Sequence, residues 1–111
     1  MKKKFRAAGQ GLRDAFGHRS VQVQGLLGMA AVLAGFLLKL TAAEWTAVVL
    51  CIGLVLASEL LNTCIEKLCD LYSTALDPRI RVIKDIAAGA VLTAAVTALV
   101  TAAIIAAAHI G

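Results

Sequence analysis

The sequence predicts an all-α membrane protein that folds as a single domain over residues 1–111. Of its residues, 60% are hydrophobic and only 16% are charged, which leaves too little polar surface for a soluble chain of this length. Three apolar runs are long enough to cross a bilayer as helices, and a shorter amphipathic segment precedes them. We therefore expect an N-terminal surface helix followed by three transmembrane helices.

The surface helix is expected over residues 3–17. One side of this helix is apolar and the other is polar: Phe5, Ala8, Leu12, Ala15 and Phe16 share the first side, and Arg6, Gln10, Arg13 and Asp14 share the second. Gly17 is the expected C-terminal stop. Two roles are open for this helix. It anchors the chain to the membrane surface, or it also covers a site on the cytoplasmic side.

The first two transmembrane spans are expected over residues 21–43 and 45–70. The uninterrupted apolar part of the first span, residues 25–38, is short for a hydrocarbon core of about 30 Å. Lys39 is expected to extend that span by directing its ammonium group outward. The second helix is expected to continue past the membrane to about Tyr72.

The third span is expected over residues 86–110, within a helix that runs from Pro78 to about His109. Asp77 is the expected N-cap and Pro78 suits the first helical position. Small residues recur at every fourth position, which predicts close helix packing within the bundle and between subunits. The recurring residues are Ala90, Ala94, Ala98, Ala102 and Ala106, with Gly89, Thr93, Thr97 and Thr101 alongside.

Basic residues indicate the orientation of the spans. They gather before the first span and around the loop of residues 71–77, so both regions are expected to be cytoplasmic. A nucleic acid is not the expected partner of these charges, because the interleaved aromatic residues of a binding domain are missing. Anionic lipid suits them better. The basic residues concerned are Lys2, Lys3, Lys4, Arg6, Arg13, Arg19, Lys67, Arg79, Arg81 and Lys84.

The three cysteines, Cys51, Cys64 and Cys69, predict neither a zinc site nor a disulfide framework. Their spacing matches no zinc pattern and their number is odd, so we expect them to be buried apolar side chains. A cleavable signal is not expected either. The basic N-terminus is not followed closely by an apolar run or by a cleavage site of small residues.

The candidate site is a polar stripe along the end of the second helix. At about 100° per residue, its members fall within one sector of the helix, and Glu59 and Glu66 are about 10 Å apart along the axis. Such residues are costly in a membrane segment and point to a functional site. The stripe comprises Glu59, Asn62, Thr63, Glu66 and Asp70, with Leu61, Cys64, Ile65, Leu68 and Tyr72 on the opposite side.

The stripe and the pair Lys84 and Asp85 are expected to meet at the cytoplasmic interface. Carboxylates hold Mg²⁺, which keeps phosphate oxygens as further ligands, and a lysine supplies charge to phosphates. The residues therefore suit phosphoryl transfer. From these residues alone, a channel or carrier with a polar-lined pore suits them equally well. Glu66 and the Lys84–Asp85 pair could also be surface charges, and His18 and His109 receive no role.

The motif resembles the small prokaryotic diacylglycerol kinase family, which includes undecaprenol kinases. The resemblance rests on E-x-x-N-x-x-x-E-x-x-x-D from Glu59 to Asp70, followed by Lys84-Asp85, and extends from about Phe5 to the C-terminus. It implies a homotrimer in the bacterial cytoplasmic (inner) membrane, with a cytoplasmic N-terminus and sites shared between subunits. It also implies transfer of the γ-phosphate of MgATP to the hydroxyl of diacylglycerol or undecaprenol.

The resemblance also assigns roles to individual residues. It implies that Glu59 is the catalytic carboxylate and that Asn62 supports it. It implies that Glu66 binds the metal ion on ATP, that Lys84 and Asp85 contact the nucleotide, and that Asp70 lies near it. The form of residues 62–66 and of the turn over residues 40–45 is closer to the undecaprenol kinases.

Two features depart from the family pattern. Some members have a glutamate as a second metal ligand near the start of the first span, and the matching position here is Gln24, which offers only a neutral oxygen. The N-terminal arm is also shorter and lacks tyrosine, so adenine contacts made there are in question. Arg6 and Arg13 are the candidates for nucleotide or lipid-headgroup contacts in this arm.

Overall fold

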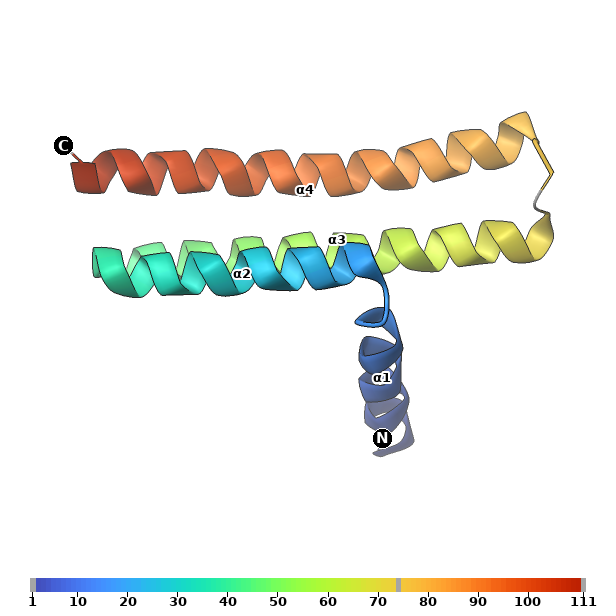
Figure 1. Cartoon of the computed structure of the whole chain (residues 1–111), viewed down its shortest axis with the longest axis horizontal. Coiled ribbons are helices and arrows are strands. Elements are labelled where there is room, and N and C mark those ends of the chain that lie inside the picture. Colours follow the sequence, from blue (N-terminus) through green and yellow to red (C-terminus); the bar gives the residue numbers. More distant parts are fainter. Residues whose placement is uncertain (1, 74, 111) are drawn as a thin grey trace.

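The computed structural model describes residues 2–73 and 75–110, and these residues form four α-helices (Figure 1). No strand occurs among them, so the predicted all-α class is confirmed. Three of the helices are long and apolar enough to cross a membrane. The helices are α1 (Lys2–Ala15), α2 (Arg19–Leu38), α3 (Ala42–Tyr72) and α4 (Pro78–Ile110).

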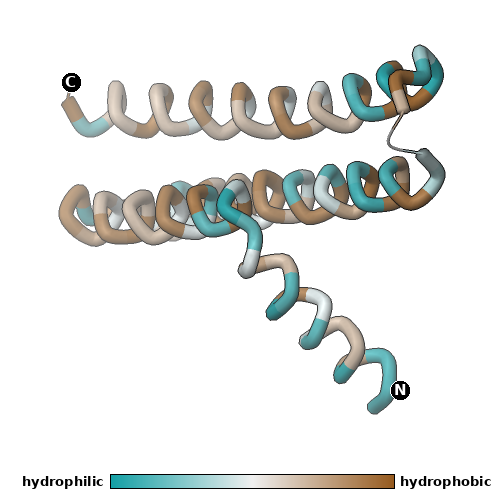
Figure 2. Tube along the Cα trace, turned by 45° about the vertical axis from the view of Figure 1, so that its right-hand side comes forward, coloured by the Kyte–Doolittle hydropathy of each residue, from teal (hydrophilic) through white to brown (hydrophobic). Residues whose placement is uncertain are grey.

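The helix α3 packs against both α2 and α4, and the three helices run side by side (Figure 1). At 1.5 Å per residue, the 20 residues of α2 span about 30 Å, whereas the 31 residues of α3 and the 33 of α4 span about 46 and 50 Å. The excess length lies at the end where α3 stops at Tyr72 and α4 starts at Pro78, which we call the loop end. We call the opposite end, which carries residues 39–41, the turn end. Figure 2 shows hydrophilic residues gathered at the loop end and along α1.

The turn between α2 and α3 corrects the predicted extent of the first span. That span was expected over residues 21–43, but α2 ends at Leu38. Lys39 adopts the left-handed conformation, with φ of 55° and ψ of 60°. The backbone N–H of Leu40 then donates to the carbonyl of Gly35 at 3.2 Å, which closes the helix end. Lys39 therefore terminates the helix, and the outward direction of its ammonium group at the membrane surface stays a prediction.

Helix α3 begins with a capping box and a close aromatic contact. The backbone N–H of Glu44 donates to Thr41 Oγ1 at 3.2 Å, and that of Thr41 donates to Glu44 Oε1 at 2.9 Å. Trp45 packs against Phe36 with ring centroids 4.9 Å apart. It also covers Gly35, where an added Cβ would lie 2.6 Å from the Trp45 ring. The lack of a side chain at Gly35 allows this contact between α2 and α3.

Helix α4 begins as predicted, with Asp77 before Pro78. Asp77 Oδ1 accepts a hydrogen bond from the backbone N–H of Arg79 at 2.9 Å, which satisfies one of the free donors of the first turn. The Arg79 side chain also binds Asp77, with Nη2 2.9 Å from Oδ2. This side-chain hydrogen bond, with the bond from the Arg79 backbone N–H, holds the pKa of Asp77 below its usual range. The cap stays charged at neutral pH.

The seam of α4 that packs on α3 differs from the predicted one. The buried positions are Ile80, Ala87 and Ala94, which are seven residues apart. Of the predicted small-residue series, only Ala94 is buried. Residues spaced by four advance about 40° around the helix at each step, so the predicted alanine series leaves the face that contacts α3 within two turns. Residues spaced by seven stay on that face. The threonine hydroxyls instead donate to the carbonyls four residues earlier, from Thr93, Thr97 and Thr101.

The cysteines only partly follow the prediction that they are buried. Cys69 is buried and Cys51 is partly buried, but Cys64 is exposed, so the prediction was wrong at that position. Cys64 lies on the outer face of α3 together with Leu61 and Leu68, both 65% exposed. In a membrane protein such a face meets lipid or another subunit, and a small apolar thiol is stable there without burial within its own chain.

An elbow joins α1 to α2. Helix α1 ends at Ala15, two residues before the expected stop at Gly17. The Phe16 ring lies over Gly25 of α2, where an added Cβ would be 3.2 Å from Phe16 Cε1. Gln22 Nε2 donates to the carbonyl of Phe16 at 2.8 Å. These contacts direct α1 away from the bundle, crosswise to the three long helices (Figure 1).

Candidate functional site

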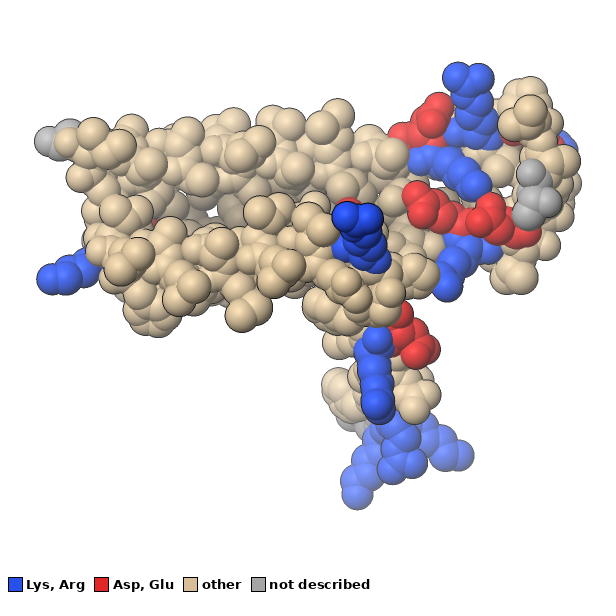
Figure 3. All heavy atoms as spheres, viewed as in Figure 1, with Lys and Arg blue, Asp and Glu red and all other residues tan. Residues whose placement is uncertain are grey.

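Most charged residues of α3 and α4 gather at the loop end, where these two helices extend beyond α2; Glu44 lies at the turn end. Figure 3 shows acidic and basic side chains interleaved there, next to a long surface without charge. The stripe of α3 contributes Glu59, Glu66 and Asp70, and α4 contributes Lys84 and Asp85. The two helices are packed together, and Lys84 of α4 meets Asp70 of α3; the convergence of the other groups on one site stays a prediction.

Glu59 is the deepest carboxylate of the stripe. It exposes only 6% of its surface, and Thr63, one turn later, exposes 9%. The hydrogen bonds and ion pairs among residues 2–73 and 75–110 include none to the Glu59 carboxylate. The Glu59 oxygens are not among the fully buried atoms, so they remain within reach of a ligand. A carboxylate in so apolar a setting is costly and points to a functional site. Glu59 is thus positioned by the packing of α3 and keeps its acceptor oxygens free.

Asn62 and Glu66 interact within the same helix face. Asn62 Nδ2 donates to Glu66 Oε1 at 3.2 Å, as the spacing of one turn allows. This bond fixes the orientation of the amide, and Asn62 Oδ1 is then buried without a hydrogen-bond partner among the described residues. A buried acceptor with no donor is rare in folded proteins. The position can therefore accept a hydrogen bond from a ligand.

Asp70 and Lys84 form the contact between α3 and α4 at the loop end. Lys84 Nζ lies 2.9 Å from Asp70 Oδ1, and the two side chains are 38% and 55% exposed. An ion pair with this exposure contributes little to stability. The ammonium group can therefore exchange its carboxylate partner for another anion at small cost. Lys67 lies nearby and lines a shallow surface hollow with Asp70 and Leu71.

Other predicted site residues lie apart from these contacts. Asp85 is exposed and makes no side-chain hydrogen bond among the described residues. Arg6 and Arg13 are exposed on α1, and Figure 3 shows the basic residues of that helix separate from the loop-end group. Their contact with a nucleotide or a lipid headgroup stays a prediction.

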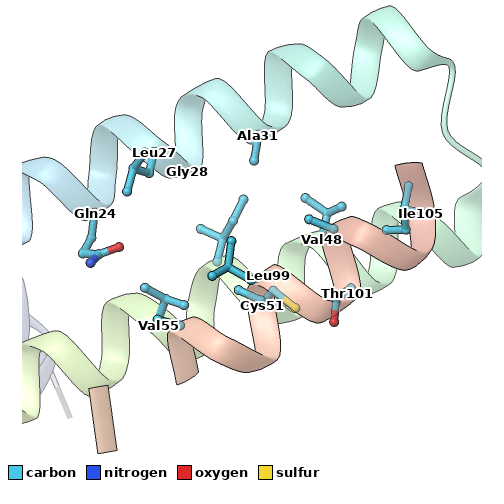
Figure 4. A pocket seen from close by; sticks show the side chains of 14 residues that line it. Gln24, Leu27, Gly28, Ala31, Val48, Cys51, Val55, Leu99, Thr101 and Ile105 are labelled. Atoms are coloured by element: carbon cyan, nitrogen blue, oxygen red, sulfur yellow. The ribbon is translucent and has the colours of Figure 1, made fainter. Parts of the chain in front are cut away.

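Gln24 faces an apolar groove between α2, α3 and α4 (Figure 4). The groove has a volume of about 370 Å³ and ends near Val55, one turn before Glu59. Gln24 is its only strongly polar lining group, since the remaining lining is aliphatic apart from Cys51 and Thr101. The structure shows no contact between Gln24 and the carboxylates of the stripe, so its role toward a metal ion also stays a prediction.

The residues present fit a metal ion whose ligands are mainly water and the phosphate oxygens of a substrate, with few from the protein. Among residues 2–73 and 75–110, no three His, Cys, Asp or Glu side chains are grouped closely enough to hold a metal ion by themselves. Mg²⁺ suits one or two carboxylates, because it keeps water and phosphate oxygens as its other ligands. Glu66, with Asn62 holding one of its oxygens, is placed for such a role.

The structure also reveals an interaction that the sequence did not predict. His109 Nε2 lies 2.9 Å from Glu44 Oε1 and 3.0 Å from Oε2, and this contact joins the end of α4 to the start of α3. The T-x-x-E pattern of Thr41 and Glu44 is a sequence signal for the capping box. No sequence signal identifies His109, because its pairing depends on the alignment of two long helices.

Comparison with known proteins identifies a family. The family model described as prokaryotic diacylglycerol kinase matches residues 6–106. The chain is 39% identical over 95 residues to the undecaprenol kinase of Bacillus subtilis (strain 168), a match that covers 85% of this chain and 77% of that protein. It is 38% identical over 96 residues to the diacylglycerol kinase of Synechocystis sp. (strain ATCC 27184 / PCC 6803 / Kazusa), covering 85% of this chain and 55% of that protein. This chain thus spans little more than half the length of the second relative.

Proposed function

We propose that this chain, which belongs to the prokaryotic diacylglycerol kinase family and is therefore a lipid kinase, transfers the γ-phosphate of MgATP to a membrane lipid alcohol. The reaction takes place at the cytoplasmic interface, which we assign to the loop end. The channel or carrier considered from the sequence finds no support among the relatives, since both are named as kinases.

The observation that carries this proposal is Glu59, a buried residue whose carboxylate has no hydrogen-bond partner among the described residues, at the border between the apolar and charged parts of α3. A lipid alcohol keeps its hydrocarbon in the membrane and presents its hydroxyl at this depth. Glu59 accepts the hydroxyl proton, and the oxygen bonds to the γ-phosphorus as the bond from that phosphorus to the bridging oxygen of ADP breaks. Asn62, one turn away, supplies a free amide oxygen that orients the hydroxyl.

The remaining site residues hold the nucleotide. Glu66 binds the metal ion on ATP, and Mg²⁺ when bound supplies charge neutralisation to the phosphates. Lys84 leaves Asp70 to bind phosphate oxygens, Asp85 contacts the nucleotide, and Asp70 lies near it. Gln24 provides a neutral oxygen where other members carry a second acidic ligand. Phosphoryl transfer requires little beyond this positioning and charge neutralisation.

The lipid substrate is diacylglycerol or undecaprenol, because each of the two relatives is named for one of them. Both are primary alcohols embedded in the membrane, so one carboxylate serves either. We assign the chain to the bacterial cytoplasmic membrane with its N-terminus in the cytoplasm, as the placement of basic residues supports. A homotrimer with sites shared between subunits would cover the apolar faces that a single chain leaves exposed.

The test is transfer of labelled phosphate from MgATP to lipid in mixed micelles, with diacylglycerol and undecaprenol offered separately. We expect labelled product from one of these lipids. Glu59→Gln, which keeps the shape of the side chain but cannot accept the proton, should lower the rate by about 10²–10⁴-fold. Its melting temperature should match that of the wild type. Wild-type turnover in Glu59→Gln would remove Glu59 as the base, and no product from either lipid would refute the proposed substrates.

A further inference from the structure

Thr63 of α3 is a buried polar residue to which the proposed reaction assigns no role. It exposes 9% of its surface and follows Glu59, which exposes 6%, by one turn on the same face of the helix. Helical side chains lean toward the N-terminus of their helix, so Thr63 lies over the turn that carries Glu59. The Cβ atoms of residues four apart are about 5–6 Å from each other. The Thr63 hydroxyl and the Glu59 carboxylate are therefore within reach of a hydrogen bond.

The Thr63 hydroxyl differs from the hydroxyls of the other threonines within the helices. Those hydroxyls donate to the carbonyl four residues earlier in their own helix, at 2.8–2.9 Å, from Thr46, Thr93, Thr97 and Thr101. The hydrogen bonds among residues 2–73 and 75–110 include none from the Thr63 hydroxyl. Its oxygen is also not among the fully buried atoms. Thr63 thus keeps its donor free for a partner other than its own backbone.

Two buried apolar residues lie level with Glu59 on the neighbouring helices. The contacts between α3 and α4 at the loop end and at the turn end set their alignment, which places Ala94 level with Glu59. On α2, Gly28 lies against Ile52, where an added Cβ would be 3.3 Å from Ile52 Cγ2. Two turns beyond this contact, Val21 is level with Glu59. Ala94 exposes 4% of its surface and Val21 is fully buried, and neither side chain can donate to a carboxylate.

The other polar side chains of α3 within one turn of Glu59 are already engaged. Ser58 Oγ donates to a backbone carbonyl of its own helix at 2.8 Å. Asn62 directs its amide nitrogen to Glu66 Oε1 at 3.2 Å. In the part of the chain that the structure describes, the Thr63 hydroxyl is consequently the side-chain donor that remains for Glu59 along α3.

We propose that Thr63 is a positioning residue of the phosphate transfer, whose hydroxyl donates a hydrogen bond to one oxygen of the Glu59 carboxylate when the lipid alcohol binds. The other oxygen is then directed toward the lipid hydroxyl and accepts its proton. Hydrogen bonds of this kind often tighten only when the substrate is bound, and a base is commonly oriented by a third group. This inference rests on the proposed function, in which Glu59 is the base, and adds the group that orients that base.

The test compares Thr63→Val with Thr63→Ser by transfer of labelled phosphate to lipid, with the full chain in mixed micelles. Valine keeps the shape of threonine without the donor, and serine keeps the donor. Loss of a hydrogen bond to a charged group should lower kcat by about 10–100-fold in Thr63→Val, with KM for MgATP unchanged. Thr63→Ser should retain most of the wild-type kcat. Wild-type kcat in Thr63→Val, or an equal loss in Thr63→Ser, would overturn the inference.

Thr46→Val is the matched control, because the same substitution removes a hydroxyl that is bonded to its own helix at 2.9 Å. It should leave kcat unchanged. Thr63→Ala removes the donor without adding bulk, so it provides the same comparison if valine disturbs the packing of α3. A loss of kcat in Thr46→Val as large as that in Thr63→Val would also overturn the inference.

A double substitution separates this positioning role from a structural one. If Thr63 acts through Glu59, adding Thr63→Val to Glu59→Gln should cause no further loss of rate, because the carboxylate that Thr63 orients is already absent. The slow Glu59→Gln rate is measured at raised protein concentration over longer times. A structural role would lower the rate by the same factor in both backgrounds, which would overturn the inference. Absence of labelled product from the wild type with either lipid would instead refute the proposed function, and with it this role of Thr63.

Discussion

At each end of the α3–α4 pair, a carboxylate of α3 meets a nitrogen-bearing side chain of α4. The two ends differ in the hydrogen-bonding groups that are left without a partner. At the turn end, Glu44 of α3 meets His109 of α4 at 2.9 Å, with the side chains 19% and 22% exposed. At the loop end, Asp70 of α3 meets Lys84 of α4 at the same distance, with the side chains 55% and 38% exposed. Each pair joins two long helices that are otherwise packed through apolar side chains.

The difference lies in the unsatisfied groups around each pair. Glu44 already accepts from the Thr41 backbone N–H and from His109, so its oxygens are engaged. On the same helix as Asp70, about three and two turns before it, lie the carboxylate of Glu59 and the buried amide oxygen of Asn62, neither of which has a hydrogen-bond partner among the described residues. A polar side-chain contact between helices is therefore not what distinguishes a site. The buried groups that the fold leaves without partners distinguish it.

The largest effect in this comparison is expected for Lys84→Gln at the loop end. Charge-assisted hydrogen bonds to phosphate are stronger than neutral ones, so their loss should reduce kcat/KM for ATP by about 10–100-fold. The melting temperature should stay unchanged, because an exposed ion pair contributes little to stability. Lys67→Gln is the matched control, since Lys67 lines the same hollow as Asp70 and forms no ion pair with the residues that the structure describes. A lowered melting temperature with full activity would give the loop-end pair a structural role.

An intermediate effect on stability is expected for Gly35→Ala at the turn end. The new Cβ would lie 2.6 Å from the Trp45 ring, and this overpacking should cost about 1–3 kcal/mol. Gly53→Ala is the matched control: nothing lies within 4 Å of its added Cβ, and alanine is favoured over glycine there by about 0.5–1 kcal/mol. Thermal unfolding in detergent should therefore shift in opposite directions. Equal shifts would mean that α2 and α3 are not closely packed at Gly35.

The smallest effect is expected for Glu44→Gln. The amide keeps one oxygen for the capping box but loses the charge and the second oxygen that meets His109. The melting temperature should fall by less than in Gly35→Ala. Kinase activity measured below the melting temperature should be unchanged. Adding His109→Ala should cause little further loss, because residues in contact are not additive. A loss of phosphate transfer in folded Glu44→Gln would place the turn end in the active site and break the comparison.

Local chemistry made much of the fold predictable from the sequence. The helical period placed Glu59 and Thr63 on the inward side of α3 and Leu61 and Leu68 on its outward side, as the structure shows. The Asp77-Pro78 pair predicted the start of α4 because cap and proline act within one turn. The membership in a lipid kinase family was also predictable, because the motif of the stripe is specific.

The features that were missed depend on how helices align with one another. The stop at Lys39 requires a positive φ in a residue without special preference for it, and Trp45 packing over Gly35 accompanies this turn. The buried seam of Ile80, Ala87 and Ala94 follows from the path of α3 beside α4, whereas the sequence shows more clearly a four-residue repeat that faces elsewhere. The partner of His109 depends on the same alignment.

The unequal lengths of the three long helices have a consequence for the choice of membrane. Only α2 is confined to about the thickness of a hydrocarbon core, while α3 and α4 have length to spare. A thicker bilayer would exceed the apolar length of α2 first, and hydrophobic mismatch costs a fraction of a kcal/mol for each ångström. The resulting strain would be largest at the elbow formed by Phe16 and Gly25. Helices α3 and α4 would shift together along the membrane normal and keep their contacts with each other. Membrane thickness would thus act on this protein through its shortest span.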